Sequence, residues 1–262
     1  MPEGDTVWLA CHRLNAALAG RRLVRAELRV PAFATENLVG RTVLEVVPRG
    51  KHQLFRFDDG RTLHSHLRLD GSWRIYRPGR PWRGGPAFQI RAVLGTDEQT
   101  AVGFRLPVLE LLPTAAEDRV VGHLGPDLLG PDWDAAEAVR RIAADPDRAI
   151  GEALLDQRNL AGLGTFYRAE ICFLQGLHPR TRVADVPDLD RLVARAQKLI
   201  MANRGRPQQT STGDLRAGAN SYVYGRGDRP CRRCGTMIKV EEFGPDGQER
   251  LSYRCPRCQP LR

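Results

Sequence analysis

Apolar side chains follow two different periods in the first 120 residues. Between Val7 and Leu18 they recur every three or four positions, which is the period of an amphipathic helix. This spacing predicts a helix over residues 5–18, and Gly20 supplies a stop signal just after it.

From residue 23 to about residue 113 the apolar positions form short runs, separated by turns that contain Gly, Pro or Asp. Strands are expected at 42–47, 53–57, 62–67, 72–76, 87–94 and 102–106. Several short strands at this spacing are typical of an antiparallel sandwich. The N-terminal region, 1–121, is therefore predicted to be an antiparallel β-sandwich with an N-terminal helix.

The pattern changes after residues 122–131, a segment rich in Gly and Pro that we interpret as a linker. Residues 132–222 are predicted to be helical at first, with Asp132 or Asp134 as the cap of the first helix. Helices are expected near 133–144, 149–156, 164–175 and 188–203, followed by a polar loop over 204–222. Residues 223–262 form a compact cysteine-bearing hairpin, which makes the whole chain an α+β protein.

Composition points to a polyanionic partner. The formal net charge is +9 and the pI is about 9.7, which favours nucleic acid first and a membrane surface second. No apolar run approaches the ~18 residues of a membrane span, and no basic region followed by an apolar stretch indicates a signal peptide. We expect a cytoplasmic protein without a membrane partner.

Lysine is rare in this chain. Lys51, Lys198 and Lys239 are the only lysines, against 37 arginines. Lysine is a compact charge whose pKa can shift, whereas arginine stays protonated and binds phosphate bidentately. Each lysine is therefore a candidate for a role that arginine cannot fill.

Four of the six cysteines have the spacing of a metal ribbon, Cys231-x2-Cys234-x20-Cys255-x2-Cys258. Paired Cys-x-x-Cys turns at this separation predict one zinc ion held by four thiolates, a closed and therefore structural site. Disulfides, which a cytoplasm disfavours, and an iron–sulfur cluster are the alternatives. Cys11 and Cys172 lie on apolar helix faces and are interpreted as buried core thiols.

The start of the chain offers a candidate nucleophile. A small second residue such as Pro2 normally permits removal of Met1, which exposes a secondary amine beside the carboxylate of Glu3. An α-amino group has a reference pKa of about 7.7–8.0, against about 10.4 for lysine, so roughly 10% of it is neutral at pH 7. A neutral amine can attack a sugar aldehyde carbon and form a Schiff base, and Glu3 could transfer the protons. The alternative is a frayed, inert terminus.

Four features follow one another along the chain: Pro2-Glu3, a Gly50-Lys51 turn, Gly162-Leu163-Gly164 and the four-cysteine ribbon. In this order they resemble the formamidopyrimidine-DNA glycosylase/endonuclease VIII family of base-excision repair enzymes. The resemblance covers essentially the whole chain, and "MPEGDTVW" is most similar to actinobacterial endonuclease VIII. The other matching segments are "RGKH", "HLRLDGSW", "LLDQRNLAGLGTFYRAE" with "GLHP", "VYGRGDRPCRRCG" and "RLSYRCPRCQ".

The resemblance implies a bifunctional DNA glycosylase and AP lyase that extrudes a damaged nucleotide. The Pro2 nitrogen would attack C1′ of its sugar, and Glu3 would open the sugar ring and shuttle protons. β,δ-Elimination would then cleave the strand. Lys51 would lie beside the phosphate, and Arg250 would match the ribbon arginine that the family places on the phosphate next to the lesion. Solvated charges are the alternative for Lys51 and Arg250.

The resemblance also implies a helix–two-turn–helix motif that grips the DNA backbone. The loop 161–165 would present backbone N–H groups at a helix start, with Gly164 and Thr165 as candidate ligands; the family usually has Asn where this chain has Thr165. Leu69 stands where the family inserts an apolar wedge, with a core leucine at a strand end as the alternative. Arg105 is a candidate for filling the void, unless it simply belongs to a strand.

The family's oxidised-purine enzymes tend to have a longer lesion-covering loop ahead of the ribbon than the stretch 210–223 of this chain. The resemblance therefore implies oxidised pyrimidines as the bases removed, in duplex, single-stranded or bubble DNA. An oxidised-purine (formamidopyrimidine or 8-oxoguanine) glycosylase remains open, as does a non-catalytic DNA-binding protein. His64 and His66 alternate on a strand, where ordinary packing is favoured over a metal pair. We expect a monomer.

Overall fold

The computed structural model describes residues 2–244, 247 and 249–261; Met1, whose removal the sequence predicts, lies outside these residues. Residues 1–123 form one compact unit and residues 124–262 form a second. Each unit is described by itself. Within the described part of the chain, no helix has the length and apolar character needed to cross a membrane.

The first unit opens with a long helix and continues almost entirely as strands. Its elements are α1 (Gly4–Leu18), β1 (Arg25–Leu28), η1 (Pro31–Phe33), β2 (Val43–Arg49), β3 (His52–Phe57), β4 (Arg61–His66), β5 (Ser72–Tyr76), η2 (Ala87–Gln89), β6 (Ile90–Gly95), β7 (Thr100–Phe104), β8 (Val108–Pro113), η3 (Thr114–Ala116) and α2 (Asp118–Val121).

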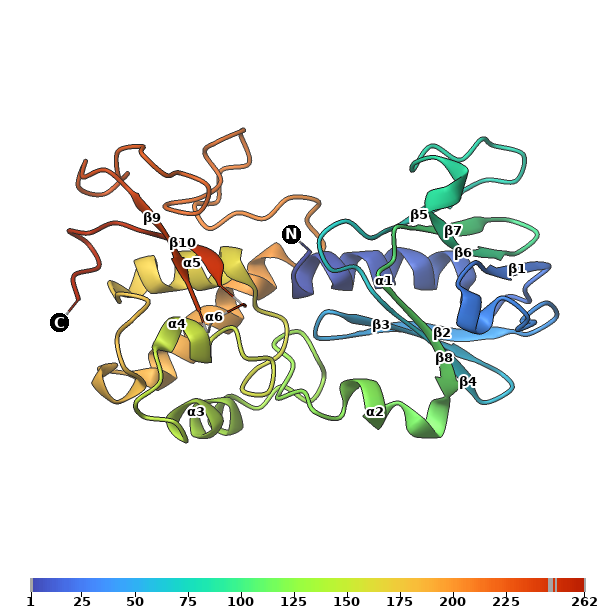
Figure 1. Cartoon of the computed structure of the whole chain (residues 1–262), viewed down its shortest axis with the longest axis horizontal. Coiled ribbons are helices and arrows are strands. Elements are labelled where there is room, and N and C mark those ends of the chain that lie inside the picture. The colour runs from blue at the N-terminus through green and yellow to red at the C-terminus, as the bar shows by residue number, and fades with distance from the viewer. Residues whose placement is uncertain (1, 245–246, 248, 262) are drawn as a thin grey trace. The chain divides into compact units, whose positions relative to one another are not determined.

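The strands form two antiparallel four-stranded sheets, with the orders β1-β6-β7-β5 and β2-β3-β4-β8. Helix α1 packs against β2 and β3 of one sheet and against β5 and β7 of the other (Figure 1). The side-chain oxygen of Asn15 accepts a 2.7 Å hydrogen bond from the backbone N–H of Val46, which fixes α1 to β2. The predicted sandwich with an N-terminal helix is confirmed.

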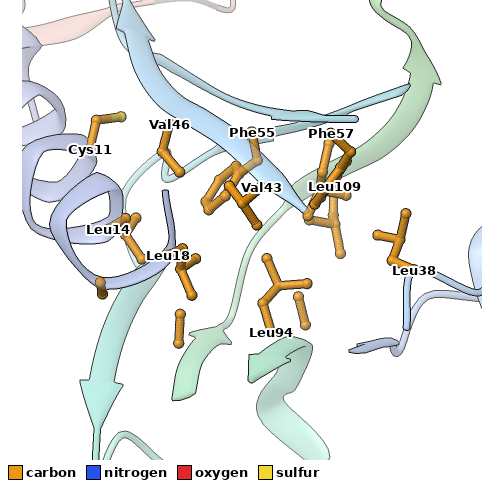
Figure 2. Close-up of a cluster of buried hydrophobic side chains, with 14 of the residues drawn as sticks. Cys11, Leu14, Leu18, Leu38, Val43, Val46, Phe55, Phe57, Leu94 and Leu109 are labelled. Atoms are coloured by element: carbon orange, nitrogen blue, oxygen red, sulfur yellow. The ribbon is translucent and has the colours of Figure 1, made fainter. Parts of the chain in front are cut away.

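The core of the first unit joins α1 to both sheets. Figure 2 shows Leu14 and Leu18 of the helix beside Val43 and Phe55 of one sheet, with Leu94 of the other sheet close by. Burying a large apolar side chain contributes about 1.5–3 kcal/mol, so this cluster holds α1 against both sheets. Cys11 is fully buried in the same cluster, as predicted.

The second unit carries the helices and the cysteine ribbon. Its elements are α3 (Ala135–Ala143), α4 (Ile150–Ala153), α5 (Thr165–Gln175), η4 (Val183–Asp185), α6 (Leu189–Asn203), β9 (Lys239–Phe243) and β10 (Arg250–Arg254). Asp134, not Asp132, caps α3 by accepting a 2.9 Å hydrogen bond from the backbone N–H of Glu137.

Helix α5 lies at the centre of this unit, because its side chains reach two clusters. One face joins the apolar cluster shared with α3 and α6, and Ala169 and Phe173 join the cluster that contains the ribbon cysteines. The fully buried Arg168 donates a 2.8 Å hydrogen bond to the carbonyl of Leu251 in β10. Cys172 is fully buried, as predicted.

The structure corrects several predicted boundaries. β1 and β8 were not predicted; β1 is only four residues long and mostly polar, so it carries little apolar signal. The strand expected at 87–94 begins at Ile90, because residues 87–89 form a 3-10 turn after Pro86. The helix expected at 149–156 contains only the single turn of α4.

Candidate functional site

Glu3 lies at the start of α1 and is completely buried, an unusual position for a carboxylate. It is the N-cap residue of the helix, and its side chain makes no capping hydrogen bond. Pro2, half-buried, immediately precedes it. Residues here also lie at the positive end of the helix dipole, which disfavours additional positive charge.

Lys51 lies in the turn between β2 and β3, directly after Gly50, whose φ of 57° belongs to the left-handed region. Burial lowers the pKa of the Lys51 amine, and the nearby charge of Glu3 partly opposes this effect by raising it. The structure therefore brings Glu3 and Lys51, two predicted site residues 48 positions apart in the sequence, into one electrostatic environment.

Leu69 lies in the turn between β4 and β5 with 63% of its surface exposed, so its interpretation as a core leucine is wrong. Arg68 beside it has a φ of 50°, a strained conformation for a non-glycine residue. Arg105, just after β7, also has a positive φ, and its guanidinium donates a 3.1 Å hydrogen bond to the carbonyl of Asp70. The structure thus places Arg105 against the turn that carries Leu69.

A group of histidines surrounds the start of β3. His52 Nδ1 and His64 Nε2 are 2.8 Å apart, and the rings of His52 and His66 meet edge to face at 4.9 Å. Burial, followed by the charges of His66, His64, His123 and Arg68, lowers the pKa of His52 to about 3. The alternation of His64 and His66 along one strand was visible in the sequence, whereas nothing in the sequence pointed to His52. The rings pack against one another, as the packing interpretation expects.

In the second unit, the loop before α5 is shaped by Gln157. Its side chain accepts a 3.0 Å hydrogen bond from the N–H of Gly162 and donates one of 3.0 Å to the carbonyl of Leu163. Gly164 is the N-cap of α5, and Thr165 is its first residue and is nearly buried. The N-terminus of an eleven-residue helix thus follows a glycine loop, as the sequence predicts for an anion site.

Glu170 of α5 is completely buried and anchors the polar loop that precedes the ribbon. Its carboxylate accepts hydrogen bonds from the backbone N–H groups of Tyr222, Val223 and Tyr224 at 2.8–2.9 Å, and another from the hydroxyl of Ser211. Glu170 was not among the predicted site residues, although a glutamate among the apolar positions of a predicted helix is a signal in the sequence.

The four ribbon cysteines converge: their Sγ atoms all lie within 4.8 Å of one another. The Cys234–Cys255 and Cys231–Cys258 sulfur distances are 3.4 and 4.0 Å, too long for disulfides. Sulfurs about 2.3 Å from a tetrahedral zinc are about 3.8 Å apart. Burial and the neighbouring thiols raise the pKa of Cys258 to about 12, so holding four thiolates here requires a cation. The residues therefore fit one metal ion.

Arg250 is the first residue of β10 and is exposed. Its guanidinium donates a 3.0 Å hydrogen bond to the carbonyl of Glu249, and its backbone pairs with Phe243 of β9. The ribbon hairpin therefore presents this arginine to solvent.

Two family models match the chain. The model of the formamidopyrimidine-DNA glycosylase N-terminal domain covers residues 1–105, which include Glu3, Lys51 and Leu69. The model of the formamidopyrimidine-DNA glycosylase H2TH domain covers residues 124–203, which include the glycine loop and α5.

Known proteins resemble the chain over its whole length. A Streptomyces coelicolor protein named probable endonuclease 8 2 is 58% identical over 99% of this chain and 94% of its own. A Mycolicibacterium smegmatis protein named DNA-(apurinic or apyrimidinic site) lyase Nei2 is 45% identical over 99% of both chains. The fold is similar to that of Lactococcus lactis Fpg, solved with abasic-site DNA, with a TM-score of 0.81 at 22% identity over 98% of this chain and 99% of that one.

Proposed function

Because the chain belongs to the formamidopyrimidine-DNA glycosylase and endonuclease VIII family of DNA-repair glycosylases and AP lyases, we propose that it excises oxidised pyrimidine bases through a Schiff base on Pro2. The observation that carries this proposal is the meeting of Glu3 and Lys51 at the start of α1, one residue from Pro2. A buried carboxylate, a partly buried amine and a terminal nitrogen supply the groups that this chemistry needs.

Removal of Met1 turns Pro2 into a secondary amine at the positive end of the α1 dipole. That position lowers the proton affinity of the amine and increases its neutral, nucleophilic fraction. The Pro2 nitrogen forms a bond to C1′ of the extruded nucleotide, and the base leaves with the electron pair of the glycosidic bond. The nitrogen gives up its proton, and the departing base takes up one proton. Glu3 donates a proton to the ring oxygen, the C1′–O4′ bond breaks, and an iminium joins Pro2 to C1′.

The iminium makes the C2′ proton acidic. Loss of that proton expels the 3′ phosphate, and a second elimination expels the 5′ phosphate, which gives the β,δ product. Lys51 would stabilise the phosphate by pairing its ammonium with the anion. The nearby charge of Glu3, which partly opposes the effect of burial on the Lys51 pKa, favours the protonated amine.

Damaged DNA is the partner that we propose for both units. The glycine loop at the start of α5 and the exposed Arg250 supply backbone N–H groups and a guanidinium for phosphates. The exposed Leu69 serves as the wedge that replaces the extruded nucleotide, since filling the gap offsets the few kcal/mol that unstacking costs. We propose that the protein acts as a monomer.

We propose that zinc is the metal of the ribbon, bound by Cys231, Cys234, Cys255 and Cys258. Four thiolates leave no open coordination position, so the ion would supply rigidity to the hairpin that carries Arg250 and no chemistry to the reaction.

Borohydride trapping on an abasic-site duplex tests the mechanism. The mature protein should be trapped covalently through Pro2. A variant with a retained N-terminal tag should lose both trapping and strand cleavage and should keep duplex binding, because only the nucleophile is blocked. Normal trapping by the tagged variant, or a crosslink that peptide mass spectrometry places elsewhere, would refute the proposal.

A panel of lesions tests the substrate. Excision of thymine glycol and dihydrouracil should exceed excision of 8-oxoguanine, since the segment 210–223 is short. The reverse order would identify an oxidised-purine glycosylase. Binding without excision of any base or cleavage of an abasic site would identify a non-catalytic DNA-binding protein. The same lesions in single-stranded and bubble DNA show which form of DNA the enzyme prefers.

A further inference from the structure

The stretch from Gly71 to Thr96 contains five arginines and no Asp or Glu. Arginines elsewhere in the chain are commonly paired; Arg56, for example, contacts Glu45 and Glu117. In contrast, Arg74, Arg77, Arg80, Arg83 and Arg91 form no ion pair with any described residue. The first unit therefore carries a local positive charge that its own carboxylates do not compensate.

Contacts with residues of β5 and β7 hold the loop over residues 77–89 in place. Gly84 lies against the ring of Phe104, and a Cβ atom there would be 2.2 Å from that ring. Trp82 packs on the small apolar cluster that contains Phe104, and the hydroxyl of Tyr76 accepts a 3.1 Å hydrogen bond from the N–H of Arg83. A loop fixed in this way presents its arginines from a defined surface.

The outer side of this loop combines charge with an exposed aromatic ring. Arg77, Arg80 and Arg83 are exposed, and Phe88 has 76% of its surface in contact with solvent. A phenylalanine this exposed, with no acidic neighbour in the sequence, is unusual for a surface whose only role is solubility.

Arg105 connects the loop to the turn that carries Leu69. Its guanidinium donates hydrogen bonds to the carbonyl of Gly84 at 3.2 Å, to Oε1 of Gln89 at 2.8 Å and to the carbonyl of Asp70 at 3.1 Å. The Arg105 side chain thus binds both the loop over residues 77–89 and the turn that carries Leu69, so the loop and the turn form a continuous surface.

We propose that residues 77–89 are a second contact surface for duplex DNA, adjacent to the site of nucleotide extrusion. Arg80 and Arg83 bind phosphates, for which a guanidinium is suited in charge and shape. Phe88 stacks on a base beside the step that Leu69 opens, as exposed aromatic side chains do on nucleic acid. This inference rests on the proposed function, because it takes damaged duplex DNA as the ligand.

The test compares two variants with the same change in charge. R80Q/R83Q removes two loop arginines, and R13Q/R119Q removes two exposed, unpaired arginines elsewhere in the first unit. Affinity for a duplex with a stable abasic-site analogue is measured from 50 to 300 mM salt. The slope of log K against log salt should become shallower by about 1.8 for R80Q/R83Q, since each phosphate contact contributes about 0.9. It should not change for R13Q/R119Q.

Phe88 is tested without altering charge. F88A should weaken binding by about fivefold or more, the loss expected for one stacked base, and the loss should persist across the salt range. L44A, which removes another exposed apolar side chain in the first unit, is the matched control and should bind normally. Because the substituted side chains are exposed, thermal melting should show that all four variants fold.

Equal slopes for the two arginine pairs, or normal affinity for F88A, would overturn the inference. Borohydride trapping by the unsubstituted protein separates this outcome from failure of the proposed function. If that protein is not trapped, the Pro2 mechanism is wrong. If it is trapped while the loop variants bind normally, only the loop proposal is wrong.

Discussion

At the scale of single residues, the chain holds ionisable groups in surroundings that differ strongly from water. Glu3 is buried at a helix start, and burial lowers the pKa of Lys51. Burying such groups lowers the stability of the folded state, and groups with shifted pKa values cluster at functional sites. The terminal residues of α1 and the turn after β2 are therefore where the cost of burying charge is concentrated in the first unit.

The histidines around β3 should make the stability of the protein depend on pH. Burial lowers the pKa of His52 to about 3 and that of His66 to about 4, against an ordinary value near 6.5. The unfolded chain therefore binds more protons than the folded one below about pH 6.5. The free energy of unfolding should fall as the pH drops from 7 towards 4.5, by up to about 1.4 kcal/mol per pH unit for each imidazole.

Urea denaturation at pH 7.5, 6.5, 5.5 and 4.5 measures this dependence. H52Q should flatten it, because one neutral imidazole is removed. H12Q, on the exposed side of α1, should retain the dependence of the unsubstituted protein. A pH dependence that is the same in H52Q and in the unsubstituted protein would contradict the assignment to His52.

At the scale of elements, α5 organises the second unit through side chains of opposite charge. Arg168 holds strand β10, and Glu170 holds the loop of residues 211–224. Both are fully buried, and both satisfy backbone groups of the segments that they contact. The helix therefore fixes the loop and the ribbon hairpin together.

E170Q should loosen that loop. The amide replaces one acceptor oxygen with an N–H donor that faces the donors of residues 211 and 222–224, so buried groups lose their partners at a cost of about 1–3 kcal/mol each. If this loop covers the extruded base, as the resemblance to the family implies for the segment ahead of the ribbon, single-turnover excision of a damaged base should slow. Cleavage of a preformed abasic site should change little, since it has no base to cover. E137Q, on the surface of α3, is the control.

Equal slowing of both reactions in E170Q would indicate a general loss of structure rather than a role in holding the base. Hydrogen exchange of the backbone N–H groups of Tyr222, Val223 and Tyr224 gives an independent measurement. Their protection should fall in E170Q and stay unchanged in E137Q.

The elements that the sequence predicts well are those with a strong local period. Helix α1 and the ribbon spacing are of this kind, and the expected bounds 5–18 differ from Gly4–Leu18 by one residue. β1 escapes prediction because its stability comes from pairing with β6, where Arg25 lies opposite Gly95. The same holds for the site: His52 meets His64 across two strands, and Glu170 binds a loop more than 40 positions later. Such contacts depend on register, which no local pattern contains.

At the scale of the whole molecule, the two compact units each have an apolar core of their own. Cys11 belongs to the core of the first unit, and Cys255 belongs to the ribbon of the second. A substitution in one core should therefore act mainly on the unit that contains it.

C255A should lose bound zinc and destabilise the second unit, because metal binding and folding of a ribbon are coupled. Calorimetry should show the transition of the second unit at a lower temperature and the other transition unchanged. C11A, which removes a buried sulfur from the first unit, should lower the transition temperature of the first unit and leave that of the second unit unchanged. C255A should also bind duplex DNA more weakly.

A single cooperative transition, shifted as a whole by either substitution, would show that the units do not unfold separately. Zinc content, measured by atomic absorption on C255A and C11A, should be about zero in the first and about one ion in the second. The zinc content therefore tests the metal site independently of whether the two units unfold separately.

The distribution of thiols has a chemical consequence for the living cell. Cys11 and Cys172 are sealed in apolar cores, where burial raises the pKa of the Cys172 thiol to about 12; the other four cysteines stand together in the ribbon. An electrophile or peroxide therefore meets reactive cysteine sulfur in one place, the ribbon, and only after the metal has left. Alkylation should modify four thiols per molecule after metal loss and none before it. A mass spectrum of the treated protein therefore measures the fraction of molecules that still hold the metal.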